Sequence, residues 1–101
     1  MTECFEDRLA ALRRRFLDRA TTESTALEGI ASDLEAGAKR AQAQQEIRRI
    51  AHGLAGAGGT FGFARISICA GELEAFVSDV PDSPDLADAC RALIAEIRST
   101  A

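Results

Sequence analysis

Residues 50–62 contain the only histidine of the chain, His52, together with five of its eight glycines. An imidazole is largely neutral near neutral pH and keeps one free ring nitrogen, so it can act as a nucleophile. Each glycine inside a helix costs roughly 0.5–1 kcal/mol relative to alanine. Because the free energy of unfolding of a small domain is low, so many glycines in one segment indicate a specific structural or functional need for them. The candidate chemistry is therefore nucleophilic and centred on His52.

Apolar positions continue at helical spacing through these glycines, which favours a helix to about residue 60 over a glycine-rich loop. They are Ile47, Ile50, Ala51, Leu54, Gly58 and Phe61. At about 100° per residue, the side chain of His52 points roughly 140° away from this apolar stripe. Gly56 and Gly59 follow His52 by one and two turns and flank the same exposed line. The spacing predicts an exposed imidazole beside bare backbone, which another protein can approach.

A loop that cradles a nucleotide phosphate is a different explanation for the glycines. Such loops follow a strand and carry either G-K-[ST] or the complete G-x-G-x-x-G pattern. Residues 56–61 lack the third glycine, no lysine follows them, and no strand pattern precedes them. A phosphate-binding loop is therefore disfavoured.

The sequence His52-Gly-Leu54-Ala55-Gly56, followed by Phe61-Gly62 and by Leu73-Glu74, resembles the histidine-containing phosphotransfer (HPt) domain family. Thr60-Phe61-Gly62-Phe63 is similar to the phosphotransfer domain of chemotaxis-type histidine kinases. The resemblance implies that His52 accepts a phosphoryl group from a receiver aspartate or a kinase and passes it to a receiver aspartate. It implies a phosphoryl carrier without ATPase or kinase activity of its own. No intrinsic cofactor is expected, and Mg²⁺ is expected on the partner, a response-regulator receiver domain.

The chain departs from the family pattern at Ala55, where the family has a lysine that would place positive charge beside the phosphoryl oxygens. Arg48 and Arg49 lie about one turn before His52, and we expect one of them to supply this charge. A solvated basic face is the other interpretation of these two arginines. Gly53, directly after the histidine, has no explanation from the sequence.

The rest of the chain predicts the helices that must position this segment. Gly37 and Gly62 are suited to end helices, and Ser83-Pro84-Asp85 is suited to begin one with Pro84 at the first helical position. A first apolar stripe begins at Phe5 and continues at helical spacing to Phe16.

Helix is unopposed by proline before residue 81, and no segment alternates with the period of a strand. The sequence Thr25-Ala-Leu-Glu28 resembles a capping box, so the N-terminal helix either breaks there or continues with a kink. Short connections predict an all-α, antiparallel up-down four-helix bundle with an additional N-terminal helix or helix extension. We expect one domain over residues 1–101, with Cys69 and Cys90 in its core.

Composition excludes several other classes of protein. The net charge of −4 and the absence of Trp and Tyr argue against a nucleic-acid partner. No apolar run is long enough to span a membrane, and the acidic start is unlike a secretory signal. Three cysteines without a C-x-x-C pair and a single histidine make neither a disulfide framework nor a zinc site. We expect a free-standing, cytoplasmic monomer.

Two other functions remain open. A non-phosphorylated HPt-like module could bind and regulate a kinase or response regulator, and the missing lysine at Ala55 keeps this interpretation in place. A structural or dimerising bundle could instead use the glycines for close packing between helices.

Overall fold

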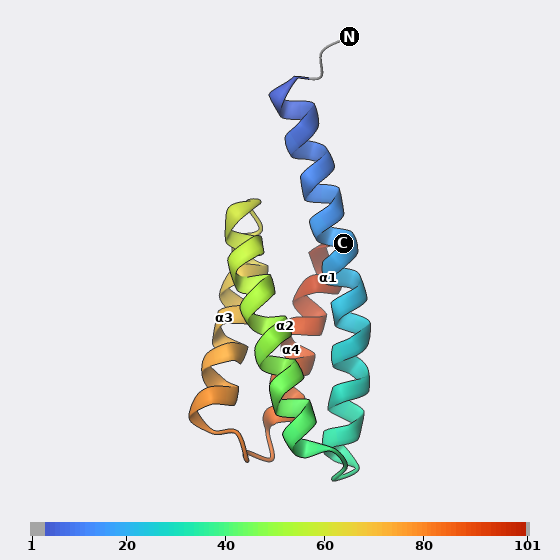
Figure 1. The fold of residues 1–101 in the computed structure, drawn as a ribbon, viewed down its shortest axis with the longest axis vertical. Helices are drawn as coiled ribbons and strands as arrows, with labels where there is room; N and C mark the ends of the chain where they lie inside the picture. Colours follow the sequence, from blue (N-terminus) through green and yellow to red (C-terminus); the bar gives the residue numbers. More distant parts are fainter. Residues whose placement is uncertain (1–3, 101) are drawn as a thin grey trace.

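The computed structural model describes residues 4–100, and this part of the chain forms four helices joined by short turns (Figure 1). They are α1 (Phe5–Glu35), α2 (Arg40–Thr60), α3 (Ala64–Asp79) and α4 (Leu86–Thr100). Each helix packs against the next, and α4 returns to pack against α1. The predicted all-α, up-down four-helix bundle is confirmed.

The N-terminal addition is an extension of α1. Helix α1 is continuous over 31 residues, so a helix start at the capping-box sequence 25–28 is wrong and the alternative of a continuing helix is confirmed. The polar residues that suggested a boundary form hydrogen bonds within α1. Ser24 is buried, and its hydroxyl donates a hydrogen bond to the Thr21 carbonyl oxygen at 2.7 Å. A helix accommodates such a residue when its hydroxyl bonds to the preceding turn of the same helix.

The first turns of α1 project beyond the ends of the other helices (Figure 1). Phe5 is therefore 78% exposed and Leu12 is also exposed, although both lie on the apolar stripe of α1. Phe16, further along the same stripe, is buried and lies 5.2 Å from Phe63 and 6.1 Å from Phe61 between ring centroids. These aromatic contacts hold the turn between α2 and α3 against α1.

The predicted helix boundaries agree closely with the structure. Gly37 and Gly62 have φ angles of +72° and +86°, a left-handed conformation that favours glycine after a helix. Ser83 Oγ accepts a hydrogen bond from the Asp85 amide at 3.1 Å. Helix α4 itself begins at Leu86, two residues later than the predicted start at Pro84.

The core is aliphatic and runs the length of the bundle. Its largest fully buried apolar side chains are Leu27, Ile47, Ile50, Leu54, Ile66, Leu86, Leu93 and Ile97. Cys90 is buried among them, and this burial raises the pKa of its thiol to about 12. Cys69 is half-buried and packs against the edge of the core, so its predicted core position is confirmed only in part. Its burial and the nearby charges of Glu72 and Glu96 raise the pKa of its thiol.

Candidate functional site

Helix α2 forms a rigid base for the candidate site because its buried face passes through the glycines without interruption. Gly58 is buried, and a Cβ placed there would lie 3.2 Å from the backbone nitrogen of Ser67 on α3. Glycine therefore permits the close approach of α2 and α3. Ser67 Oγ donates a hydrogen bond of 2.6 Å to the Ala55 carbonyl oxygen. The predicted helix to residue 60 is confirmed, and α3 is held tightly against it.

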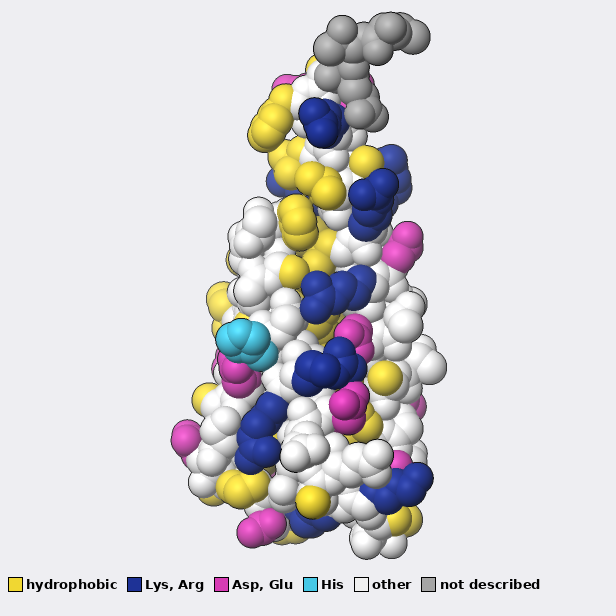
Figure 2. Space-filling view, in the orientation of Figure 1, with side chains coloured by type: hydrophobic (Ala, Val, Ile, Leu, Met, Phe, Trp, Pro, Cys, Tyr) yellow, Lys and Arg dark blue, Asp and Glu magenta, His cyan; other side chains and the backbone are white. Residues whose placement is uncertain are grey.

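His52 projects from α2 into solvent, as the helical phase predicts. Its side chain is 80% exposed, and its Nδ1 lies 2.7 Å from Oε2 of Glu74 on α3. Figure 2 shows the imidazole standing out from the surface with an acidic side chain against it. When Nδ1 carries the proton and donates a hydrogen bond to Glu74, the lone pair of Nε2 is left free. The pair therefore presents an oriented nucleophilic nitrogen to an approaching molecule.

At Gly56 and Gly59, one and two turns after His52, no side chain projects from the surface of α2. A Cβ at Gly56 would meet no atom within 4 Å, so packing inside the chain does not require glycine there. A Cβ at Gly59 would only make ordinary contact with Ser67 Oγ, at 3.4 Å. The absence of side chains at these exposed positions leaves room for another protein beside the imidazole.

The family model described as Hpt domain matches residues 6–100. The chain belongs to the Hpt domain family. Hpt domains act in histidine phosphotransfer within phosphorelays and interact with receiver domains and kinases. Comparison with curated proteins and with solved structures found no significant match.

Arg48 and Arg49, one of which the sequence suggested as the cation of this Hpt domain, both have other partners. Arg48 Nη2 donates to the Val77 carbonyl oxygen at 3.4 Å, near the end of α3. Arg49 is paired with Glu46 at 3.0 Å and with Glu23 at 3.6 Å. Glu46 raises the pKa of the Arg49 guanidinium above its ordinary value. Within residues 4–100, no hydrogen bond or ion pair joins either arginine to His52 or Glu74.

Ala55 is half-buried against the core, and its backbone carbonyl accepts the hydrogen bond from Ser67 on α3. The position at which the Hpt pattern has a lysine therefore contributes no charge. Any cation beside the imidazole of this Hpt domain must come from another residue.

Sequence reasoning assigned no role to Glu74, although it is part of the Leu73-Glu74 motif. A signal was present, since His52 lies 11 residues before Phe63 and Glu74 lies 11 residues after it. Two antiparallel helices joined by a short turn bring such equidistant residues to the same level. The turn at Gly62 thus indicates which residue of α3 faces the histidine.

Sequence reasoning also missed a contact between Arg19 and Gly53. A Cβ at Gly53 would overlap with Nη2 of Arg19, so the guanidinium group of α1 lies directly over the backbone of α2. Arg19 and Gly53 lie 17 residues before and after Ala36, at the turn between these helices. A side chain at position 53 would displace this guanidinium, which is the flexible end of the Arg19 side chain.

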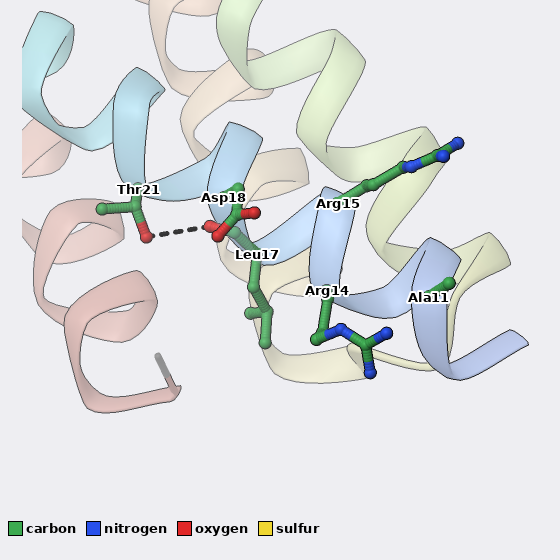
Figure 3. Close-up of a pocket in the computed structure, with 6 residues that line it drawn as sticks. All are labelled: Ala11, Arg14, Arg15, Leu17, Asp18 and Thr21. Carbon is green, nitrogen blue, oxygen red and sulfur yellow. Dashed lines mark hydrogen bonds between the residues drawn. The ribbon is translucent and has the colours of Figure 1, made fainter. Parts of the chain in front are cut away.

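The site of this Hpt domain is a convex surface rather than a pocket. One hollow on the described residues is lined by one face of α1 and includes none of the predicted site residues (Figure 3). Its lining residues are Ala11, Arg14, Arg15, Leu17, Asp18 and Thr21. Residues 4–100 hold no cluster of three or more acidic, His or Cys side chains arranged for a metal ion. None of the described helices is both long and apolar enough to cross a membrane.

Proposed function

We propose that the chain is a histidine phosphotransfer protein of a two-component phosphorelay and that His52 is its phosphoacceptor. The observation that supports this proposal is the exposed His52 imidazole, whose Nδ1 lies 2.7 Å from the carboxylate of Glu74. Phosphoryl transfer requires positioning and charge stabilisation more than complex covalent chemistry. A single nucleophile on a rigid helix is sufficient when the partner supplies the remaining groups.

In the proposed step, the Nε2 lone pair of His52 attacks the phosphorus atom of a receiver aspartyl phosphate. The N–P bond forms while the P–O bond to the aspartate breaks, and the aspartate leaves as a carboxylate. The imidazole ring becomes positively charged, with the proton retained on Nδ1. The Glu74 carboxylate stabilises that charge through its hydrogen bond. The reverse reaction passes the phosphoryl group to another receiver aspartate, and the partner domain contributes Mg²⁺ and its acidic pocket.

The test is transfer from phosphorylated receivers. Purified receiver domains are charged with radiolabelled acetyl phosphate and incubated with the wild-type chain and with His52→Gln. We expect acid-labile, base-stable label on the wild type and none on the variant. Since His52 is 80% exposed, His52→Gln should retain the wild-type helical content and free energy of unfolding. Label that persists on His52→Gln would contradict the assignment.

A binding module that regulates its partner without being phosphorylated is the alternative, and the uncharged Ala55 is the observation that favours it. It predicts that a receiver or kinase binds wild type and His52→Gln equally and that neither becomes labelled. We further propose that the chain acts as a cytoplasmic monomer without a nucleic-acid partner. Sedimentation across a range of concentrations tests the monomer, and a dimer abolished by Gly56→Leu would indicate the structural function instead.

A further inference from the structure

This inference rests on the proposed phosphorylation of His52 and concerns the charge that such a group creates. A phosphoryl group carries a charge of about −1.5 to −2 near neutral pH and three strong acceptor oxygens. On His52 it would stand beside the carboxylate of Glu74, which lies 2.7 Å from the same ring. Neighbouring negative charges raise each other's free energy unless a cation compensates them. The site therefore needs a positive group that reaches the imidazole from a direction other than α3.

Arg19 reaches the residue next to His52 from a direction other than α3. Helix α2 packs against α3 on one flank and α1 on the other, and Arg19 comes from α1. Its guanidinium lies on Gly53, the residue that follows His52. The acid and the cation thus approach the exposed ridge of α2 from opposite sides.

The guanidinium of Arg19 also has unused donors. Within the described residues it makes no hydrogen bond and no ion pair, whereas Arg13, Arg48, Arg49 and Arg91 all have partners. An arginine has five N–H donors in a planar fork that matches the oxygens of a phosphate. Gly53 contributes by leaving its backbone bare, because any side chain there would push the guanidinium away from α2.

We propose that Arg19, seated on the bare backbone at Gly53, forms a binding site for the phosphoryl oxygens carried by His52. The site takes a dianionic phosphoryl group and supplies the positive charge that position 55 lacks. Arg48 and Arg49 are not needed for this role, since both are attached to other groups.

The experiment measures the ionisation of the phosphoryl group itself. The full chain is phosphorylated on His52 with phosphoramidate, a small donor that needs no partner protein, and phosphorus NMR follows the signal as the pH changes. A nearby cation favours the dianion and lowers the phosphoryl pKa. Arg19→Gln should raise that pKa by roughly half a unit, the size expected for an exposed ion pair. Arg19→Lys should restore part of the difference, since it keeps the charge without the planar fork.

Arg14→Gln is the matched control. It removes the same formal charge from the same helix, but Arg14 lines the hollow on another face of α1 (Figure 3). At about 100° per residue it lies roughly 140° around α1 from Arg19. The phosphoryl pKa of Arg14→Gln should match that of the wild type.

Gly53→Ala provides a second variant that cannot fail through misfolding of the core. The atom it displaces is the end of a flexible side chain, and alanine is a better helix former than glycine. We expect an unchanged or higher free energy of unfolding together with a raised phosphoryl pKa.

Equal pKa values for Arg19→Gln, Arg14→Gln and wild type would overturn the Arg19 site while leaving phosphotransfer intact. Absence of phosphohistidine at His52 with both phosphoramidate and charged receivers would overturn both proposals. Phosphohistidine formed only with phosphoramidate, with a pKa sensitive to Arg19, would support the Arg19 site and contradict the phosphorelay function.

Discussion

The two helix pairs of the bundle are built differently. Helices α2 and α3 approach closely through Gly58, and their surface carries the pair His52 and Glu74. Helices α1 and α4 are joined by large buried side chains and, at the surface, by a cluster of opposite charges. In that cluster Arg91 binds both oxygens of Glu35 at 2.7 and 2.8 Å, and Glu28 pairs with Arg98 at 3.3 Å.

Helices α2 and α3 carry the candidate reactive groups, whereas α1 and α4 mainly stabilise the bundle. On α2 and α3, small residues and a sparse arrangement of charge leave an imidazole accessible and oriented. In the charged cluster of α1 and α4, ionic groups neutralise one another and offer no free nucleophile. Arg19 links the two helix pairs, since it belongs to α1 and its guanidinium reaches Gly53 on α2. The comparison predicts that stability and phosphotransfer can be changed separately.

The largest expected effect on stability is in the pair formed by α1 and α4. Leu93 on α4 is fully buried, so Leu93→Ala should lower the free energy of unfolding by about 2–5 kcal/mol. Urea denaturation measures this loss. The transfer rate per folded molecule should remain that of the wild type. Ala92→Ser on the exposed face of α4 is the control. A reduced transfer rate per folded Leu93→Ala molecule would show that stability and phosphotransfer cannot be changed separately.

Overpacking between α2 and α3 should affect both properties. The branched side chain of Gly58→Val must enter the space occupied by Ser67, so we expect a loss of about 1–3 kcal/mol in unfolding free energy. Separation of the two helices should also weaken the His52–Glu74 hydrogen bond and slow transfer. Gly56→Val is the matched control for stability alone, because a Cβ there meets open space but lies on the surface that the partner approaches. If both valine variants are equally stable, the close approach at Gly58 has no energetic importance.

Glu74→Gln should change transfer without changing stability. Loss of the carboxylate removes the charge that orients and stabilises the imidazole, and we expect transfer about tenfold slower, equivalent to about 1.4 kcal/mol in the barrier. Nitrogen NMR of His52 should show more of the tautomer protonated at Nε2. Glu72→Gln, an exposed change on the same helix, should affect neither measurement. An unchanged tautomer ratio in Glu74→Gln would exclude the positioning role.

The smallest effect concerns the charged cluster of α1 and α4. The Arg91 guanidinium lowers the pKa of Glu35 below its ordinary value of 4.5. The resulting stabilisation is present above about pH 4.5 and is lost as the pH falls through the lower pKa of the folded state. Thermal unfolding at low salt should show a weaker acid dependence for Glu35→Gln than for wild type. Glu72→Gln should follow the wild-type curve, and identical curves for all three proteins would show that the pair contributes nothing measurable.

Local sequence determined the helices, their ends and the direction of His52. The apolar spacing through Gly58 predicted the full length of α2, because burial of one face outweighs the low helix propensity of glycine. Gly37 and Gly62 marked the turns because few other residues adopt a positive φ angle. The exposed imidazole followed from helical phase alone. The matching family model confirms the resemblance that these residues suggested.

Tertiary structure decided the continuity of α1 and the partners of each charged group. The polar segment near Ser24 looked like a boundary, yet packing buries that serine and its hydroxyl bonds within the helix. Arg48 and Arg49 looked available beside the histidine, but Arg48 bonds to the Val77 carbonyl on α3, and Arg49 pairs with Glu46 on its own helix and with Glu23 on α1. Glu74 and Arg19 reach His52 and Gly53 across helix interfaces. Such contacts depend on the rotation and level of one helix against another, which periodicity within a single helix does not contain.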